Sequence, residues 1–272
     1  MKKFKVALQL YSVRDHLEKD LENTLKKVKE AGYDYVELAG PFDRSAEEIK
    51  ALLDKYSIEA ISVHNPIKNW QDKGIEEIEF LKKLGVKYCA IPWQNVSAYH
   101  NDWEGTIKTF RDYMKDLKGK GISILYHNHD FEFEKIDGEY IFDKLYSAIP
   151  EMDPEIDTCW VRYGGEDPAS YIKKYAGRVA LVHLKDFSAD KLGAGPVYDL
   201  IGDDNAKKPS KEENNFKFRS LGEGMMDFSK VLSACEEAGT EYVIVEQDES
   251  YDEDSLECAK RSREYLKKEF SI

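Results

Sequence analysis

Acidic side chains, histidines and one lysine follow short apolar, β-branched segments of this sequence, where predicted strands end. In chain order these strand-end side chains are Gln9, Tyr11, Glu37, His64, Trp93, the segment 127–132, Asp157, His183, Lys185 and Glu246. Carboxylates brought together at one edge repel each other, and burial disfavours their charged form, unless a cation neutralises them. Any one of these residues alone is better explained as a capped or solvated side chain. The set as a whole predicts a divalent metal site.

The donor atoms indicate the kind of metal. A set of three carboxylates and one imidazole is rich in oxygen, which favours Mn²⁺, Mg²⁺, Co²⁺ or Fe²⁺ over a closed structural zinc site. Such a site keeps coordination positions open for adjacent hydroxyl and carbonyl oxygens of a substrate. We expect one divalent ion, with Mn²⁺ as the first expectation and Mg²⁺, Co²⁺, Fe²⁺ or Zn²⁺ as alternatives.

The elements that must position these side chains repeat along the chain. An amphipathic helical segment ends at a glycine, and a β-branched or aromatic strand begins shortly after it. Glycine suits the position after a helix because it adopts the left-handed backbone conformation without a Cβ clash. Five such joints indicate a structural repeat, and their glycines are Gly32, Gly85, Gly121, Gly177 and Gly239.

Helix signals support the same pattern. Leu21, Leu25 and Val28 are spaced to lie on one helical face. Ser45 with Glu48 forms a capping box, which predicts a helix start at that point.

Eight strands are predicted, and each is followed by a helix or by enough chain to form one. This alternation forces parallel pairing, because short hairpin returns are unavailable. Eight units in a domain of about 250 residues predict a (β/α)8 TIM barrel, with residues 1–272 as a single domain; an open doubly wound sheet is the rival. The expected strands are 4–12, 34–39, 59–64, 87–93, 122–127, 154–160, 179–184 and 241–246.

One segment, between Phe187 and Asp227, interrupts the regular alternation of predicted strands and helices. It is rich in Gly, Asp, Asn and Lys and shows little periodicity. Loops of that length in a compact domain are usually either functional lids or disordered. Because the segment follows the seventh strand, we favour a lid or a substrate-facing excursion.

The composition excludes several classes of protein. The 272 residues carry 40 basic and 53 acidic side chains, a net charge of −13, so nucleic-acid binding would need a concentrated basic patch. The clearest basic stretch, Lys207–Lys211, is diluted by acids on both sides and is interpreted as a solvated loop. The four cysteines form no C-x-x-C pair, and no apolar run approaches the length of a membrane span. We expect a cytoplasmic protein that binds neither nucleic acid nor membranes, with homo-oligomerisation left open.

Five ordered motifs resemble the xylose-isomerase-like barrel superfamily and, within it, the sugar phosphate isomerase/epimerase branch. Each motif alone is weak, but the likeness runs over essentially the whole chain and in the right order. The motifs are Leu10–Asp15, Tyr126–Glu132, Ile156–Trp160, Val182–Asp186 and Val245–Asp248. In that family, residues of strands five to eight hold one divalent metal. The resemblance implies Asp157, His183 and Glu246 as metal ligands.

The fifth strand departs from the commoner pattern of this family. Many relatives have Glu-Asn-His where this chain has His127-Asn128-His129, and Glu132 follows in the next loop. Either Glu132 supplies the missing carboxylate or His127 itself coordinates. We favour Glu132, because a site with three acids suits polyol chelation, and His129 would then serve as a base or substrate contact.

The superfamily also contains DNA-repair endonucleases with a trinuclear zinc site. Such enzymes need further histidines, and this chain has Trp93 and Trp160 where histidines would fall. Together with the net charge of −13, this argues against a nuclease.

The leading functional hypothesis is metal-assisted isomerisation or epimerisation of a small sugar or keto-sugar through an enediolate. Glu132 and Glu246 are the candidate bases, with His129 in reserve. Lys185 could stabilise oxyanion charge, or it could form a salt bridge at the barrel rim with an acid such as Asp186 or Glu223. The same enediolate chemistry could instead expel a β-substituent, which would make the protein a dehydratase or lyase of keto-sugars or keto-inositols. A non-catalytic sugar-binding barrel is the third reading.

Aromatic side chains near the strand ends could provide platforms for the C–H face of a sugar, although core packing explains any one of them better. Arg14 could contact substrate or pair with a nearby acid. The sequence holds no Gly-rich phosphate cradle, which favours an unphosphorylated substrate. The aromatic candidates are Tyr11, Trp93, Trp160 and Phe187.

Overall fold

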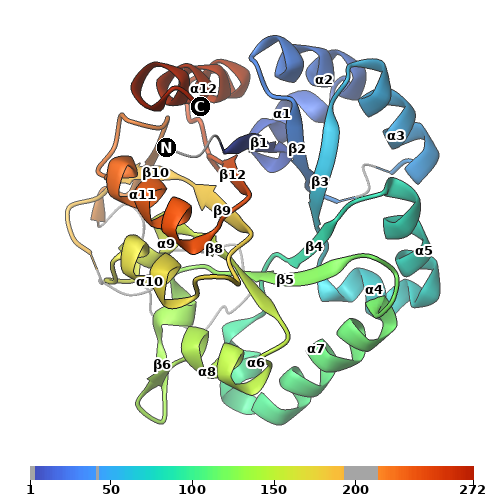
Figure 1. The fold of residues 1–272 in the computed structure, drawn as a ribbon, viewed down its shortest axis with the longest axis vertical. Helices are drawn as coiled ribbons and strands as arrows, with labels where there is room; N and C mark the ends of the chain where they lie inside the picture. Colours follow the sequence, from blue (N-terminus) through green and yellow to red (C-terminus); the bar gives the residue numbers. More distant parts are fainter. Residues whose placement is uncertain (1–3, 41–42, 193–213) are drawn as a thin grey trace.

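The computed structural model describes residues 4–40, 43–192 and 214–272, in which eight parallel strands close into a barrel (Figure 1). Around the barrel the strands follow chain order, and the last strand, β12, closes onto the first. The predicted (β/α)8 barrel is therefore confirmed. The barrel strands are β1 Lys5–Gln9, β2 Tyr35–Leu38, β3 Glu59–His64, β4 Tyr88–Ile91, β5 Ser123–His127, β8 Asp153–Asp157, β9 Leu181–Leu184 and β12 Tyr242–Val245.

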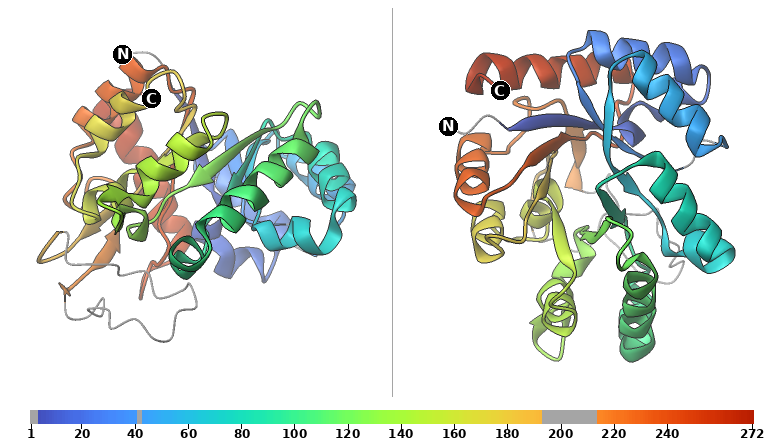
Figure 2. Two further views of the ribbon diagram at one scale, coloured as in Figure 1. Left: turned by 90° about the horizontal axis from the view of Figure 1, so that it is seen from below. Right: turned by 45° about the vertical axis from the view of Figure 1, so that its right-hand side comes forward.

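Helices surround the barrel on its outer side, as the two further views in Figure 2 make clear. Two short antiparallel pairs lie outside the barrel sheet: β6 (Lys135–Ile136) with β7 (Glu139–Tyr140), and β10 (Asp186–Ser188) with β11 (Lys217–Arg219). The helices are η1 Leu10–Val13, α1 Arg14–Leu17, α2 Leu21–Glu30, α3 Ala46–Lys55, α4 Ile67–Lys73, α5 Ile75–Leu84, α6 Val96–Asn101, α7 Trp103–Leu117, η2 Phe131–Phe133, α8 Ile141–Ala148, α9 Thr158–Tyr163, α10 Pro168–Lys174, α11 Phe228–Ala238 and α12 Ser255–Phe270.

The helix signals in the sequence correspond to real helix ends. Ser45 and Glu48 form the predicted reciprocal capping box at the start of α3. The predicted glycine joints all have a positive φ, between +76° and +96°, which side chains with a Cβ rarely adopt. The predicted helix start at Ser45 and the predicted left-handed glycines before the strands are therefore confirmed.

Two strands, β1 and β8, end three residues earlier than the sequence predicts. β1 stops at Gln9, whose side-chain oxygen accepts a hydrogen bond from the Tyr11 backbone and caps η1. β8 stops at Asp157, because its carboxylate accepts the Trp160 backbone N–H, 3.1 Å away, and starts α9. Polar side chains at these strand ends begin the next helix, a competing signal that apolar periodicity does not reveal.

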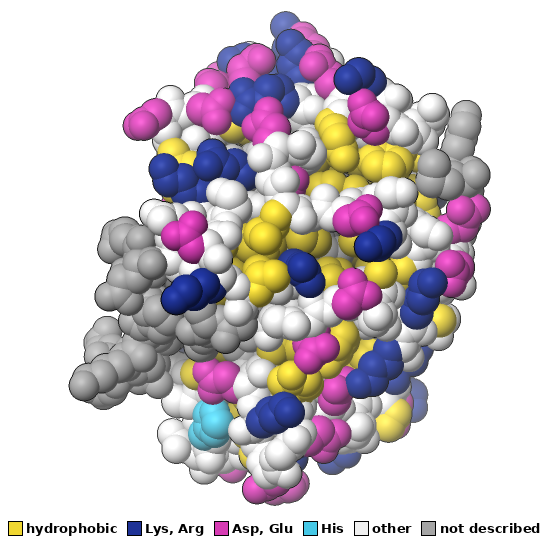
Figure 3. All heavy atoms as spheres, turned by 90° about the vertical axis from the view of Figure 1, so that its left-hand side faces the viewer, with side chains coloured by type: hydrophobic (Ala, Val, Ile, Leu, Met, Phe, Trp, Pro, Cys, Tyr) yellow, Lys and Arg dark blue, Asp and Glu magenta, His cyan; other side chains and the backbone are white. Residues whose placement is uncertain are grey.

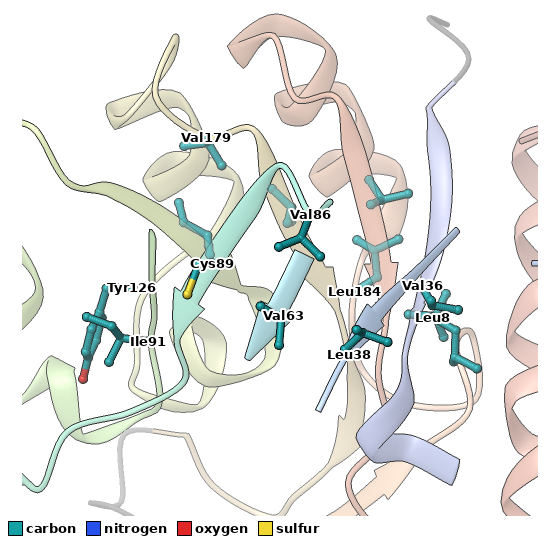
Figure 4. Packing of buried hydrophobic residues seen from close by; sticks show 14 of the residues in the cluster. Leu8, Val36, Leu38, Val63, Val86, Cys89, Ile91, Tyr126, Val179 and Leu184 are labelled. Atoms are coloured by element: carbon teal, nitrogen blue, oxygen red, sulfur yellow. The ribbon is translucent and has the colours of Figure 1, made fainter. Parts of the chain in front are cut away.

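Alternation along each strand divides the core into two parts. One set of side chains faces outward and packs beneath the helices, as Leu8, Val36 and Leu184 do in Figure 4. The inward-facing set fills the amino-terminal part of the barrel with apolar side chains. Two residues further along each strand the same inward face becomes polar: β9 places Leu181, then His183, and β12 places Ile244, then Glu246. The polar side chains at the carboxyl ends of these strands therefore lie directly above a packed apolar layer.

The segment that breaks the repeat is partly structured. Its ends form β10 and β11, which pair Phe187 with Phe218. Residues 193–213 of the predicted lid, which include the basic stretch Lys207–Lys211, lie outside the described residues.

The side of the molecule drawn in Figure 3 shows no broad basic patch among the described residues. Basic and acidic side chains are interspersed over it. Among the described residues, no helix has both the length and the apolarity needed to cross a membrane.

Asp186 ties the loop after β11 to the end of β9. Its buried carboxylate accepts four backbone N–H groups, from Phe187 and Gly222 at 2.9 Å, Gly224 at 3.0 Å and Met226 at 3.1 Å. A Cβ atom at Gly224 would lie 2.2 Å from this carboxylate, so the loop needs a glycine there.

We expect Asp186→Ala to lower the free energy of unfolding by about 3 kcal/mol, because it leaves four N–H donors, one of them buried, without the acceptor that they share. Urea denaturation measures this value. Asp227→Ala is the matched control, since that residue caps α11 through one exposed N–H and should cost only about 1 kcal/mol. Equal losses in the two variants would contradict the role given to Asp186.

Candidate metal centre and active site

A pocket of about 450 Å³ opens at the carboxyl ends of the barrel strands. Ionisable side chains from β3, β5, β9 and β12 line it together with aromatic and apolar ones. A larger hollow of about 850 Å³ adjoins it beside η1, α2 and α3, but none of the strand-end acids lines that hollow. The smaller pocket is therefore the candidate active site, and its lining residues are Tyr11, Ala39, Gly40, His64, Pro66, Asn69, Pro92, Trp93, His127, His129, Lys185, Glu246 and Asp248.

Four side chains from adjacent strands meet at the pocket, and we call them the four-residue cluster: His127, Asp157, His183 and Glu246. One candidate donor atom from each lies within 4.8 Å of the others. His183 Nδ1 is 2.7 Å from Glu246 Oε2, and His127 Nε2 is 3.4 Å from Asp157 Oδ2. Parallel register brings them together, because Asp157 pairs with His183 across β8 and β9.

Lys185 lies against this cluster and is almost fully buried. Its Nζ is 2.9 Å from Asp157 Oδ2, 2.8 Å from Glu246 Oε2 and 3.0 Å from Asp248 Oδ1. Lys185 therefore forms salt bridges at the barrel rim, as one of the two sequence-based interpretations expected, but its partners are these three acids and not Asp186 or Glu223. Asp186 is held by backbone N–H groups, and Glu223 lies 3.4 Å from Arg261.

A second group, which we call the glutamate–histidine ring, lies beside the cluster and shares His183 with it: Glu37, His64, Glu155 and His183. His64 Nε2 is 2.9 Å from Glu155 Oε2 and 3.2 Å from Glu37 Oε2. His183 Nε2 is 2.8 Å from the same Glu37 oxygen. His183 is thus the one side chain common to the four-residue cluster and the ring.

Burial and mutual proximity set the ionisation of these groups. Burial opposes charge on Glu37, but His64 and His183 outweigh it and hold the pKa of Glu37 well below its usual value. Burial likewise opposes charge on Glu246, and Lys185 with His183 lowers its pKa well below normal. Despite burial, the surrounding carboxylates raise the pKa of His64 to about 10 and that of His183 well above its usual range.

The two histidines of the fifth-strand motif behave differently from His64 and His183. Burial is the main cause that lowers the pKa of His127, and His183 adds to it. Burial together with His127 and Lys185 lowers the pKa of His129 well below its usual value. Both imidazoles are therefore neutral near pH 7, which suits one as a metal ligand and the other as a base.

Glu132 is placed apart from the four-residue cluster. Its Oε1 accepts a hydrogen bond from the Tyr126 hydroxyl, and its Oε2 accepts the His129 backbone N–H at 2.7 Å. It belongs neither to the described candidate metal groups nor to the pocket lining. Burial raises the pKa of this carboxyl to about 8. Of the two fifth-strand candidates, the structure brings His127, rather than Glu132, into contact with Asp157.

The donor set fits a divalent ion. His127 Nε2 is buried and makes no hydrogen bond within the described residues, and the nearest carboxylate oxygen of the cluster, Asp157 Oδ2, lies 3.4 Å from it. Two carboxylates and two imidazoles supply two oxygen and two nitrogen donors, a mixture that Mn²⁺, Fe²⁺, Co²⁺ and Zn²⁺ accept. This set contains one carboxylate fewer than the sequence analysis expected.

Two residues of the site were missed by sequence reasoning. Glu155 lies two residues before Asp157 on β8, so strand alternation alone places both on the inner face. Asp248 lies two residues after Glu246 in a motif that was already recognised. Side chains two residues apart on a strand point to the same face, so both residues could have been predicted from the positions of Asp157 and Glu246.

The aromatic candidates divide into two pairs. Tyr11 and Trp93 line the pocket, whereas Trp160 and Phe187 are fully buried in an aromatic cluster behind it. Arg14 holds the loop after β1 against the loop after β12, because its Nη1 donates to the Tyr11 and Asp248 carbonyl oxygens at 2.9 and 2.7 Å.

Comparison with known proteins decides the family. The model of the family described as xylose isomerase-like TIM barrel matches residues 25–269, most of the chain. The chain belongs to this family. The resemblance drawn from the five sequence motifs is confirmed.

Individual relatives are distant but extend over nearly the full length. The inosose dehydratase of Clostridium beijerinckii is 26% identical, with 92% of this chain and 90% of that protein covered. A crystal structure of a sugar phosphate isomerase/epimerase from Parabacteroides distasonis superposes with a TM-score of 0.77 at 23% identity, covering 98% of both chains. A crystal structure of the IolI protein with a bound zinc atom gives a TM-score of 0.66 at 17% identity, covering 99% of this chain and 100% of that one. At these identities, the two crystal structures support the fold alone.

We expect His127→Gln to weaken binding of Mn²⁺ at least 10-fold, because His127 supplies a donor atom to the four-residue cluster. Glu132→Gln should leave the affinity unchanged, since its carboxylate is bonded elsewhere. Titration calorimetry on metal-free protein measures both constants. The reverse order of effects would restore Glu132 as the fifth-strand ligand.

Glu132 also predicts a pH dependence of stability. Its pKa is about 8 in the folded protein against 4.5 for the free side chain, so between these values the folded state retains a proton that the unfolded state has lost. Stability should therefore decrease as pH rises through this window, by about 3 kcal/mol from pH 5 to pH 8. Glu132→Gln should remove that part of the decrease. Parallel curves for parent and variant in urea denaturation would refute the assignment.

Proposed function

We propose that this protein is a metal-dependent dehydratase of a small keto-polyol, of the keto-inositol class. The observation that carries the proposal is that a neutral imidazole, His129, and a buried ammonium, Lys185, line the same pocket as two members of the four-residue cluster. This combination suits removal of a proton next to a ketone. The C. beijerinckii relative, which is named an inosose dehydratase, supports elimination as the outcome.

His127, Asp157, His183 and Glu246 are proposed to hold one divalent ion. Such an ion would act as a Lewis acid on a ketone and hydroxyl of the substrate. Its identity is left to measurement, since the mixed nitrogen and oxygen donors accept Mn²⁺, Fe²⁺, Co²⁺ or Zn²⁺.

His129 is the proposed base. Its ring lines the pocket and packs parallel to Phe131, with centroids 5.3 Å apart, which restricts its orientation. Its lowered pKa keeps the imidazole neutral and able to accept a proton. Glu132 and Glu246, the bases expected from the sequence, are less suitable. Glu132 does not line the pocket, and Glu246 is bound by Lys185 and His183.

Lys185 is proposed to stabilise negative charge on the substrate oxygen. Burial opposes its charge, but Asp157, Asp248 and Glu246 raise its pKa well above the usual value, so the ammonium persists. A fixed cation in a site that excludes water lowers the energy of an enolate oxygen more than it would in solvent.

The proposed reaction balances without another reactant. His129 takes the proton from the carbon beside the ketone, and the electron pair of that C–H bond forms the enolate. The enolate then re-forms the ketone as a C=C bond develops and the hydroxyl on the β-carbon departs. The imidazolium returns its proton to that hydroxyl, so one molecule of water leaves and the enzyme regains its starting state.

The isomerase or epimerase expected from the sequence is less well supported than this alternative. Both reactions begin with the same proton transfer, and geometry at the pocket does not separate them. The named sequence relative is a dehydratase, and this likeness favours elimination.

Turnover tests the proposal directly. Protein loaded with Mn²⁺, and separately with Co²⁺, would be incubated with a keto-inositol and with simple ketoses, and the products examined by mass spectrometry. We expect loss of one water from the keto-inositol. A product of unchanged mass would indicate isomerisation, and binding without C–H exchange in D₂O would indicate a non-catalytic sugar-binding protein; both results would contradict the proposal.

The roles of the two side chains can be separated in the same assay. We expect His129→Gln to abolish C–H exchange in D₂O, and Lys185→Met to slow turnover about 100-fold. Tyr33→Phe is a suitable control, because that buried residue does not line the pocket and its hydroxyl donates to the Ala259 carbonyl oxygen. Unchanged exchange in His129→Gln would remove this residue from the mechanism.

A further inference from the structure

We infer that Glu37 is a positioning residue for the candidate metal centre: it fixes the ring of His183 so that Nδ1 faces the four-residue cluster. This inference rests on the proposed function, because it requires that the cluster holds an ion. It concerns a residue of β2, on a strand that contributes nothing to the cluster itself.

The two nitrogens of His183 have distinct neighbours. Nδ1 is 2.7 Å from Glu246 Oε2, inside the cluster, and Nε2 is 2.8 Å from Glu37 Oε2, on the opposite side of the ring. A metal-bound imidazole must leave one nitrogen free of its proton, and the partner of the other nitrogen decides which. Both nitrogens face a carboxylate, and an ion in the cluster would replace the proton on Nδ1. Glu37 would then accept from Nε2, so that nitrogen would keep its proton and Nδ1 would be the donor atom.

Glu37 is itself held in place. Its Oε2 accepts a hydrogen bond from Gln9 Nε2 at 2.7 Å, and His64 Nε2 lies 3.2 Å away. Register places Gln9 directly beside Glu37 across β1 and β2. The Glu37 side chain is fully buried and does not line the pocket. It therefore acts through His183 and not by touching a substrate.

Glu155 is less well placed than Glu37 to orient the ring of His183. Its Oε1 is 3.6 Å from His183 Nε2, whereas its Oε2 is 2.9 Å from His64 Nε2. Its main partner is thus His64, which does not belong to the four-residue cluster. The geometry therefore predicts an order of effects, with Glu37 ahead of Glu155.

Loss of such a hydrogen-bond partner typically weakens metal affinity 10- to 100-fold, because the ligand ring is free to rotate or to exchange its tautomer. Two variants of Glu37 separate charge from hydrogen bonding. Glu37→Gln retains an acceptor of the same size, and we expect about 10-fold weaker binding. Glu37→Met removes the acceptor, and the loss should approach 100-fold.

Titration calorimetry with Mn²⁺ and with Zn²⁺ on the metal-free full-length protein provides the affinity and the number of ions per chain. Glu155→Gln should weaken binding less than Glu37→Gln. The control is Glu77→Gln, since Glu77 is also buried and ion-paired, 3.4 Å from Lys73, but lies on α5 outside the barrel. Its affinity should equal that of the parent. Glu37→Gln, which changes no side-chain volume, keeps the test valid if Glu37→Met does not fold.

Nitrogen-15 NMR of the zinc-loaded protein reports the ring directly. The parent should show one histidine with a protected Nε2 proton and a metal-bound Nδ1, and Glu37→Met should lose that protected proton. Parent-like affinity and spectra in both Glu37 variants would overturn the inference while leaving the proposed metal centre intact. Two ions per parent chain, falling to one in Glu37→Gln, would make Glu37 a ligand and would also overturn it. Failure of the parent to bind either ion would instead refute the metal centre and the proposed function with it.

Discussion

Compensation of buried charge at the carboxyl end of the barrel is the constraint on which the rest of this structure depends. Five buried carboxylates contribute five negative charges if all are ionised, and Lys185 contributes one positive charge; the carboxylates are those of Glu37, Glu155, Asp157, Glu246 and Asp248. Two protons on His64 and His183 would leave a net charge of minus two, and a divalent ion in place of those protons would leave the same value. The centre can therefore exchange protons for a metal ion without any change in its total charge.

The barrel makes this concentration of charge tolerable. His183 and Glu246 follow inward residues that are apolar and packed, Leu181 and Ile244, so the backbone beneath them is held by strand pairing and core contacts. The strands supply the charged groups from points far apart in the chain, and parallel register aligns them at one level. Hydrogen bonds such as that from Gln9 to Glu37 then fix individual side chains. The stability of the barrel base supports an arrangement that would otherwise be unfavourable.

The sequence predicted the architecture well, because the signals are local and repeated. Glycines after helices and a capping box at Ser45 are short-range features, and their structural outcome depends little on the rest of the chain. Strand ends were less accurate, since Asp157 both ends β8 and caps α9. The candidate site was predicted in part: Asp157, His183 and Glu246 do meet. The place of Glu132 could not be predicted, because its hydrogen bonds with Tyr126 and the His129 backbone depend on how the loop after β5 folds back.

The apolar base of the barrel also has a kinetic consequence. Side chains such as Leu125, Leu181 and Ile244 fill the interior beneath the charged residues and are almost completely shielded from solvent. In the proposed mechanism, an ion and a substrate would therefore enter through the same opening, the ion first and the substrate above it. Saturating substrate would then enclose the ion, and an added chelator would remove it only as fast as the substrate dissociates.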